Sequence, residues 1–399
     1  MNVLVGVTGG IAAYKSAHLV REFIKRDDDV RVVMTESAEE FITPMTLQAL
    51  SENPVGSDLF DAGYESEIGH IDLARWADVV VVAPATADFI ARAAAGMADD
   101  LLTTVLLATR APVVVAPAMN TQMWYHPSVT RNIETLESEY GWRVIQPDSG
   151  ELACREIGPG RMPDPPDLVE EVLVEATEPT LKDRRVLITA GPTHEPIDPA
   201  RMLTNPSSGK MGYALAKIAR RLGAEVTLVS GPTQLEQPAG VELVSVQTAQ
   251  QMYDAVIERV ESMDVVVKSA AVCDWRPKTS SPSKLKKETM TGTLELERNP
   301  DVLAELGQRA SAEAGDGRPL LVGFAAESSD VAERGERKRR DKGADILVAN
   351  KIGGDDSTFG SDDIVAHILT GTSETRYGPI SKEALAEHLF EIVARRLER

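Results

Sequence analysis

The chain contains Val3-Leu4-Val5-Gly6-Val7-Thr8-Gly9-Gly10 near its start and Val186-Leu187-Ile188-Thr189-Ala190-Gly191-Pro192-Thr193 near its middle. Each stretch is typical of a buried strand that runs directly into a turn of small residues. In an α/β sheet such a turn presents the amides of a helix N-terminus to an anion. The two stretches lie about 180 residues apart, a typical length for one domain each. We therefore expect two α/β domains, each with its own phosphate-bearing ligand.

Composition narrows the class of protein. The 399 residues are 43% hydrophobic, enough for two buried cores. They include 62 acidic and 42 basic residues, a formal net charge of −20, which argues against nonspecific nucleic-acid binding because that needs a basic surface. Cys154 and Cys273 are expected to be reduced thiols in a cytoplasmic protein. No stretch reaches about 18 uninterrupted apolar residues, and the chain begins with a strand rather than a signal peptide, so we expect no membrane partner.

Val-rich runs mark the expected strands of both halves. They lie at 3–7, 30–34, 79–83, 113–116, 186–189, 225–229, 264–268 and 345–349. Such runs are typical of strands covered on both faces of a parallel sheet, and helical patterns separate them. The sequence therefore predicts two Rossmann-like parallel-sheet domains. The first, at 1–176, is flavodoxin-like, the second, at 184–399, binds a nucleotide, and a linker at 177–183 joins them.

The first glycine loop has the spacing G-x-x-G-G rather than G-x-G-x-x-G. Thr35 and Ser37 follow the second expected strand and can donate their hydroxyls to a single terminal phosphate. A bound dinucleotide would more often show the full fingerprint, so these residues, with Gly9 and Gly10, favour a mononucleotide such as FMN. The alternative for the glycines is a tight strand–helix turn without a ligand.

Three further segments of the first half carry residues capable of chemistry. His70 lies in Gly-His-Ile-Asp-Leu-Ala-Arg-Trp at 69–76, and Asn120 ends Ala-Pro-Ala-Met-Asn at 116–120. Cys154 opens a Gly- and Pro-rich loop suited to a lid. Each residue has a plainer interpretation. His70 could be a satisfied polar residue, Asn120 a helix cap and Cys154 a small buried hydrophobe.

Taken together, these segments resemble the flavoprotein family of cysteine decarboxylases, and within it the phosphopantothenoylcysteine decarboxylases. Further matching motifs are Gly-Gly-Ile-Ala-Ala-Tyr-Lys at 9–15, Ala-Pro-Ala-Thr-Ala-Asp at 83–88 and Ala-Gly-Met-Ala-Asp-Asp-Leu-Leu at 95–102. The resemblance implies an FMN cofactor with Thr86 among the residues that bind it. It also implies flavin-domain trimers with FMN at the subunit interfaces.

The resemblance also assigns roles in a redox-neutral decarboxylation, in which the carbon that bears sulfur is oxidised before CO₂ leaves and reduced afterwards. It implies that His70 is the base of the oxidative step, that Asn120 holds the substrate carboxylate, and that Cys154 is the acid of the final reduction. The family usually has glycine after the lid cysteine, whereas this chain has Arg155. If the position needs a positive φ, Arg155 is strained.

The second half contains Thr-Asn-Pro-Ser-Ser-Gly-Lys-Met-Gly at 204–212. It is not a Walker A loop, because Met211 stands where Ser or Thr would bind Mg²⁺, and the alternative is a capped helix start. Two basic clusters, 284–287 and 337–342, stand out in this acidic chain. Such clusters are usually solvated faces, but a triphosphate would need their cations, and the i,i+4 spacing of Lys338 and Lys342 puts both on one helix face.

These segments resemble the phosphopantothenate–cysteine ligases, in the order found in that family. Ile-Thr-Ala-Gly-Pro-Thr at 188–193, Asn-Pro-Asp-Val at 299–302 and Gly-Phe-Ala-Ala-Glu at 323–327 also match. The resemblance implies that CTP and Mg²⁺ activate 4′-phosphopantothenate as an acyl-cytidylate, from which the cysteine amine displaces CMP. It implies that Asn205 holds the acyl group. The residues implied to bind the nucleotide are Lys284, Lys338, Lys342, Asp274, Pro300, Asp301, Val302, Leu303 and Phe324, with Asp274 also engaging Mg²⁺.

The leading hypothesis is a bifunctional enzyme of coenzyme A biosynthesis that converts 4′-phosphopantothenate and cysteine to 4′-phosphopantetheine. A flavin-binding regulatory protein of the phosphatase-inhibiting kind is an alternative from another class. A decarboxylase of peptide C-terminal cysteines or a flavin prenyltransferase is a third possibility, but neither needs residues 184–399. The resemblance also implies a homo-oligomer of flavin-domain trimers and ligase-domain dimers, with a dodecamer as one closed form.

Overall fold

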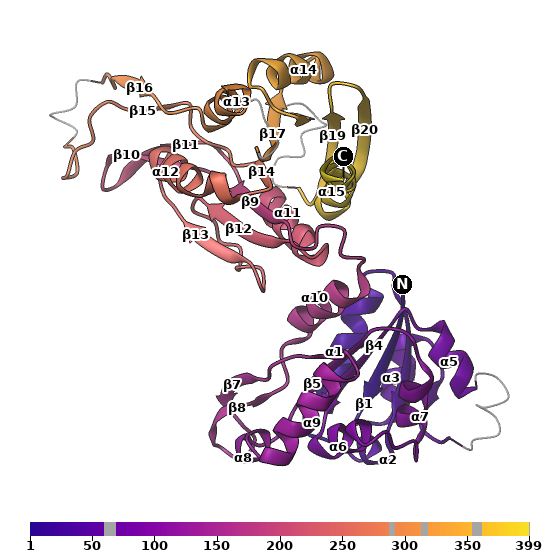
Figure 1. The fold of residues 1–399 in the computed structure, drawn as a ribbon. Helices are drawn as coiled ribbons and strands as arrows, with labels where there is room; N and C mark the ends of the chain where they lie inside the picture. Colours follow the sequence, from indigo (N-terminus) through magenta and orange to yellow (C-terminus); the bar gives the residue numbers. More distant parts are fainter. Residues whose placement is uncertain (60–68, 287–291, 313–317, 353–360, 399) are drawn as a thin grey trace. The chain divides into compact units, whose positions relative to one another are not determined.

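The structure is a computed structural model that describes the whole chain except residues 60–68, 287–291, 313–317, 353–360 and 399 (Figure 1). The chain forms two compact units, Met1–Glu178 and Pro179–Arg399. Leu181, inside the segment predicted as linker, is fully buried in the hydrophobic core of the second unit. None of the helices within the described ranges combines the length and apolar character that crossing a bilayer requires.

A parallel sheet forms the centre of the first unit, and over the described residues its strand order is β3-β2-β1-β4-β5-β6. The strands are β1 (Asn2–Val7), β2 (Asp29–Met34), β3 (Val55–Gly56), β4 (Val79–Ala85), β5 (Val113–Pro117) and β6 (Arg143–Val144). The four strands expected in this half from Val-rich runs are therefore confirmed, each within two residues at its ends. β3 and β6 were not expected, because two-residue strands leave no periodic pattern in a sequence.

Helices cover both faces of this sheet, which explains why its strands are apolar without alternation. Alternate residues of β1 enter two different cores: Val3, Val5 and Val7 pack on one face, and Leu4 packs on the other. One core includes side chains from α1 (Ala13–Ile24), α3 (Pro44–Ser51) and α10 (Pro165–Ala176). The other includes side chains from α5 (His70–Trp76), α6 (Ala87–Ala94), α7 (Leu101–Ala108) and α9 (Pro127–Ser138).

The second unit is built on a larger sheet, with the order β13-β12-β9-β14-β17-β18-β19-β20 in the described part of the chain. Its strands are β9 (Arg185–Ala190), β12 (Glu225–Ser230), β13 (Glu242–Ser245), β14 (Val265–Lys268), β17 (Leu320–Glu327), β18 (Ile346–Lys351), β19 (Asp363–Leu369) and β20 (Glu374–Ser381). The pairs from β13 to β18 are parallel, whereas β19 and β20 are antiparallel. The predicted parallel sheet is confirmed, and the antiparallel edge is an addition to it.

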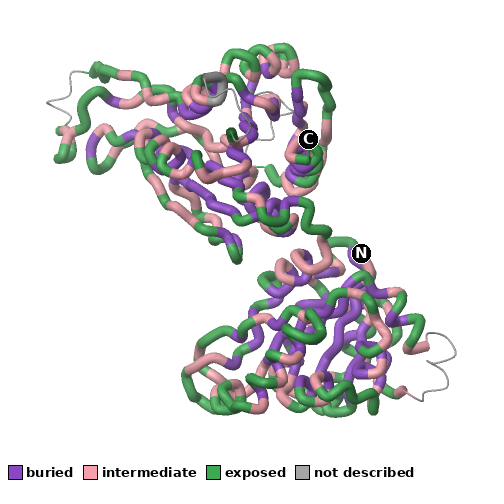
Figure 2. The backbone as a smooth tube through the Cα atoms, in the orientation of Figure 1, coloured by how far each residue is buried: buried purple, intermediate pink, exposed green. Residues whose placement is uncertain are grey.

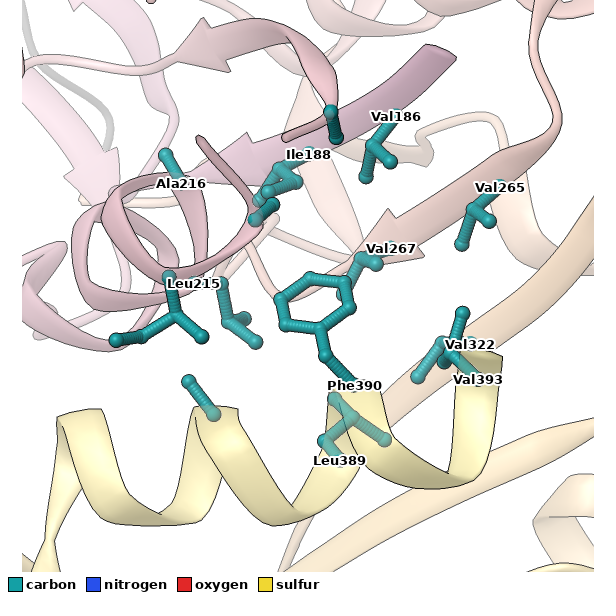
Figure 3. Close-up of a cluster of buried hydrophobic side chains, with 14 of the residues drawn as sticks. Val186, Ile188, Leu215, Ala216, Val265, Val267, Val322, Leu389, Phe390 and Val393 are labelled. Carbon is teal, nitrogen blue, oxygen red and sulfur yellow. The ribbon is translucent and has the colours of Figure 1, made fainter. Parts of the chain in front are cut away.

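The core of this unit lies between its sheet and two helices, α11 (Lys210–Arg221) and α15 (Lys382–Leu397). Figure 3 shows Phe390 of α15 beside Val267 of β14, with Ile188 of β9 and Leu215 of α11 nearby. The opposite face is covered by α12 (Ala249–Arg259) and α13 (Val302–Ala312). In both units the buried residues follow the central strands, as Figure 2 shows.

Candidate active sites

The glycine loop of the first unit lies at a topological switch point. The strand order reverses between β1 and β4, and ligands of open α/β sheets bind at such points beyond the carboxyl ends of the strands. Gly9 and Gly10 follow β1, and Thr86 follows β4. Thr8 links the two loops, because its hydroxyl donates to the carbonyl of Pro84 at 2.8 Å and accepts from the amide of Thr86 at 3.0 Å. The two loops expected to bind FMN therefore meet.

The segment that follows β2 contributes the two hydroxyl residues expected at the phosphate, with Thr35 before α2 (Glu36–Glu39) and Ser37 within it. A β-carbon added at Gly9 would lie 2.4 Å from Cβ of Ser37, so only glycine allows this close approach. Thr35 is 7% exposed, and its hydroxyl oxygen is buried without a hydrogen-bond partner in the described structure. A buried hydroxyl with no partner costs free energy unless a ligand satisfies it. This orphaned group beside a glycine cradle fits the terminal phosphate of a mononucleotide.

Asn120 and Cys154 lie together at the same carboxyl edge of this sheet, after the neighbouring strand β5. Asn120 follows β5 and caps α8 (Thr121–Trp124), accepting from the amide of Gln122 at 2.7 Å through Oδ1. Its Nδ2 donates to Sγ of Cys154 at 3.3 Å and to Oε2 of Glu156 at 2.6 Å. Cys154 is exposed. It lies in the turn between β7 (Asp148–Glu151) and β8 (Ile157–Arg161), the hairpin that forms the predicted lid.

His70 does not lie with this pair within one chain. It is the first residue of α5, which packs on the face of the sheet that carries α7. Figure 1 shows α5 on the opposite side of the first unit from the β7–β8 hairpin and α8. A site that uses His70, Asn120 and Cys154 together therefore cannot be assembled from a single first unit in this conformation.

Arg155 has a φ of +66°, so the position after Cys154 adopts the left-handed backbone conformation. The condition under which strain was expected at Arg155 is therefore met. A non-glycine residue there carries roughly 1–2 kcal/mol of steric strain. We expect Arg155→Gly to raise the free energy of unfolding by about 1 kcal/mol and Arg155→Val, which is β-branched, to lower it by about as much.

Urea denaturation followed by tryptophan fluorescence tests this expectation, because Trp76, Trp124 and Trp142 all lie in the first unit. Equal stability of the Gly and Val variants would show that the position carries no backbone strain.

A cavity of about 510 Å³ in the second unit gathers most of the residues expected to bind the nucleotide. They come from four segments that are distant in the sequence: the turn after β14, the start of α13, β17, and α14 (Val331–Asp341) with the residue that follows it. The expected residues that line it are Asp274, Pro300, Asp301, Val302, Leu303, Phe324, Lys338 and Lys342. The cavity opens beside β14, where the strand order of this sheet reverses between β9 and β14.

The two lysines of α14 and its end are held by carboxylates. Lys338 Nζ lies 2.6 Å from Oε1 of Glu327, whose side chain is only 8% exposed, and Lys342 pairs with Asp301. Burial lowers the pKa of the Lys342 ammonium, and Asp274 partly offsets this effect. The cations are thus aimed and restrained before any anion binds, as expected of a preorganised phosphate site.

A second cavity of about 550 Å³ shares Asp274, Phe324 and Lys338 with the first. Asn205 lines it, and its Nδ2 donates to the carbonyl of Val272 at 3.0 Å. The 207–210 segment also lines it and leads into α11, with Gly209 at φ +79°. An acyl group held by Asn205 would therefore lie next to the nucleotide cavity. In the described part of the chain, no group of three or more His, Cys, Asp or Glu side chains could hold a metal ion.

Lys284 is exposed and does not line either cavity. The backbone of its neighbour Leu285 is held from both sides: its amide donates to Oδ2 of Asp198 at 3.1 Å, and its carbonyl accepts from Nη2 of Arg201 at 2.6 Å. Asp198 and Arg201 belong to a hairpin, β10 (His194–Asp198) and β11 (Arg201–Thr204), that leads directly to Asn205. Lys287, the last lysine of the cluster, lies outside the described residues.

Sequence reasoning did not select four residues that the structure brings to these sites. Glu156 contacts Asn120, Glu327 holds Lys338, Asp198 anchors the segment of Lys284, and Lys268 lines the nucleotide cavity. Lys268 left a signal, because it is the one charged residue at the end of a Val-Val-Val run. Glu156 and Asp198 are ordinary acidic residues in an acidic chain and leave no such signal, whereas Glu327 ends the matching motif at 323–327, which gives it no role of its own.

Comparison with known proteins divides the chain at nearly the same place as the two compact units. The Flavoprotein family model matches residues 1–177, and the DNA/pantothenate metabolism flavoprotein C-terminal domain matches residues 181–397. The fold and the sites thus define a flavoprotein joined to a nucleotide-using domain of pantothenate metabolism.

Relatives along the whole chain make the identification more specific. The coenzyme A biosynthesis bifunctional protein CoaBC of Vibrio vulnificus strain CMCP6 is 48% identical over 391 residues, covering 98% of this chain and 96% of the relative. That of Escherichia coli K12 is 46% identical over 398 residues, covering 98% and 97%. A crystal structure of a CoaBC C-terminal domain is 40% identical, with a TM-score of 0.47, covering 55% of this chain and 99% of that one.

The chain belongs to the family of the coenzyme A biosynthesis bifunctional proteins. It is a bifunctional enzyme with a flavoprotein decarboxylase half and a ligase half. The alternatives of a regulatory flavin-binding protein, a peptide decarboxylase and a prenyltransferase are thereby set aside.

Proposed function

We propose that the second unit activates 4′-phosphopantothenate with CTP and joins it to cysteine, and that the first unit decarboxylates the product with FMN in the cytoplasm. The observation that carries this proposal is the nucleotide cavity, where eight residues chosen from the sequence converge from four separate segments. The product of the ligase is the substrate of the decarboxylase, which explains the fusion of the two halves.

In the ligase, a carboxylate oxygen of 4′-phosphopantothenate attacks the α-phosphorus of CTP. The bond to the β-phosphate oxygen breaks, and pyrophosphate leaves. The cysteine amine then attacks the acyl carbon, CMP leaves, and the amine proton passes to solvent. Such a reaction needs charge neutralisation and alignment more than covalent catalysis. Lys338 and Lys342 supply charge, and Asn205 orients the acyl group from the adjoining cavity.

Mg²⁺ would be held by the phosphates of CTP and by Asp274, which borders both cavities. This fits the donor set, because Mg²⁺ commonly binds one or two carboxylates together with substrate phosphates. We expect an excess of EDTA to reduce pyrophosphate release at least about 100-fold, since the charge of the triphosphate would go unneutralised.

Release of CO₂ from added 4′-phosphopantothenoylcysteine should not change under the same conditions. Pyrophosphate release that persists in EDTA would refute the metal assignment, and equal rates with ATP and CTP would refute the choice of nucleotide.

In the decarboxylase, FMN would lie over Gly9, Gly10 and Thr86, with its phosphate at Thr35 and Ser37. When bound it can accept a hydride from the substrate and return it after CO₂ leaves. His70 would take the thiol proton during oxidation, and Asn120 Nδ2 would donate to the substrate carboxylate. Cys154, already within hydrogen-bond reach of Asn120, would supply the final proton.

The separation of His70 from Asn120 within one chain supports a site shared between two subunits of a flavin-domain trimer, with ligase-domain dimers completing the oligomer. We expect His70→Asn and Asn120→Asp chains to be inactive in decarboxylation when each is prepared alone. When the two are co-expressed, each trimer that contains both chains would have one of its three shared sites with an intact His70 and an intact Asn120, so the mixed trimers should regain about a third of the full activity.

Purified oligomers that carry a different affinity tag on each chain allow this measurement on the mixed species alone. Failure of the mixture to regain activity would contradict a shared site.

A further inference from the structure

We propose that Lys268 is a phosphate-binding residue of the ligase site, an additional cation that contacts the phosphates of the bound nucleoside triphosphate. The inference rests on the proposed function of the second unit, because it takes the same cavity as the nucleotide site. It adds a residue to which neither the motifs nor the family resemblance gave a role.

The position of Lys268 supports this role. Lys268 ends β14, and its register partners are Thr189 on β9 and Gly323 on β17, so it lies at the switch point in the middle of the sheet. The three residues before it, Val265–Val267, are buried, and Lys268 is the first residue of the strand to reach the cavity. A side chain at this place faces the bound ligand of an open α/β sheet.

The charges around the cavity leave Lys268 without a partner. The charged residues that line the nucleotide cavity are Lys268, Asp274, Arg298, Asp301, Lys338 and Lys342. Lys338 is paired with Glu327, Lys342 is paired with Asp301, and Arg298 lies over the ring of Trp275 at 5.4 Å. Within the described residues, no hydrogen bond or ion pair holds the Lys268 ammonium. An ammonium in such surroundings is costly unless an anion accompanies it.

The protonation of Lys268 agrees with this geometry. Burial and the nearby Lys342 lower the pKa of Lys268 to about 8, against a smaller opposing effect of Asp274. The Lys268 side chain is therefore charged below about pH 8 and neutral above it. A bound triphosphate would favour the charged form and draw a proton back onto the lysine.

The test is calorimetric titration of the full chain with CTP and Mg²⁺ at pH 7. Lys268→Gln should weaken CTP binding about 10- to 100-fold, the usual effect of losing a charge-assisted hydrogen bond, whereas Lys268→Arg should keep affinity within a few-fold. Lys182→Gln, an exposed lysine outside both cavities, is the matched control and should bind CTP as the unmodified chain does.

Two further readouts distinguish phosphate binding from a structural role. The melting temperature of ligand-free Lys268→Gln should not fall below that of the unmodified chain, because the half-buried Lys268 ammonium makes no hydrogen bond or ion pair within the described residues. Between pH 7 and 9.5 the unmodified chain should lose CTP affinity more steeply than Lys268→Gln, which still has Lys342 in the same cavity.

Unchanged affinity in Lys268→Gln, or an equal loss in the Arg and Gln variants with a lower melting temperature, would overturn the assignment. Absence of CTP binding by the unmodified chain would instead overturn the proposed nucleotide, and the assignment with it.

Discussion

Asn120→Asp is expected to lower the rate of CO₂ release from 4′-phosphopantothenoylcysteine at least about 100-fold and to leave CTP-dependent amide formation unchanged. The substitution replaces the donor Nδ2 by an acceptor oxygen. That oxygen would face the Glu156 carboxylate, now 2.6 Å from Nδ2, and any substrate carboxylate would meet two negative charges. The cap of α8 survives, because aspartate also accepts from the amide of Gln122.

Asn132→Asp is the matched control, since Asn132 lies in α9, away from this cluster. Reactions of both variants are quenched at fixed times, and the amounts of CO₂ and of the amide product are measured separately. Loss of both activities in a folded Asn120→Asp chain would contradict two independent sites, and retention of CO₂ release would remove Asn120 from the decarboxylase.

Lys284→Gln is expected to produce the opposite result: a loss of CMP formation of at least about 100-fold with unchanged release of CO₂ from added 4′-phosphopantothenoylcysteine. The backbone of the segment is anchored at Leu285 by Asp198 and Arg201, so removal of one exposed charge should not displace it. Lys284 does not line the cavity in this structure. The prediction therefore requires the side chain to reach the triphosphate only once CTP is bound.

Lys278→Gln provides the control for a lost charge on the same segment, because Lys278 is exposed and pairs with Glu295 at 3.6 Å. Pyrophosphate release measured at saturating CTP and at CTP well below KM shows whether binding or the chemical step is affected. An active Lys284→Gln chain would remove Lys284 from the ligase site and leave the charge of the site to the lysines that line the cavity.

The parallel cores were predictable because their strands are buried on both faces, which leaves unbroken apolar runs such as Val79–Val82 in the sequence. The antiparallel edge of the second sheet, formed by β19 and β20, was not predictable. β19 alternates between buried and half-buried residues and its apolar residues are interrupted by His367, and β20 is mostly exposed, so neither shows the Val-rich pattern of the parallel strands. The β10–β11 hairpin was not predictable either. It matters because it holds Leu285, a residue that is distant from it in the sequence.

The residues of the candidate sites also fall into those that the sequence could indicate and those that it could not. Asn205 and Asp274 could be selected because they lie in motifs that resemble the ligase family, although Asn205 follows β11 of an antiparallel hairpin rather than a strand of the parallel sheet. Glu327 could not, because its role depends on a salt bridge to Lys338 that no local pattern encodes. The placement of His70 depends on how α5 packs on the sheet, which no local pattern in the sequence encodes.

The most direct test of the two-step function is mass spectrometry of a single incubation of the purified chain with 4′-phosphopantothenate, cysteine, CTP and Mg²⁺. We expect 4′-phosphopantetheine and CMP to appear in equal amounts, with one CO₂ lost for each. Accumulation of 4′-phosphopantothenoylcysteine with CMP would contradict the proposed decarboxylase site, and the absence of CMP would contradict the proposed ligase.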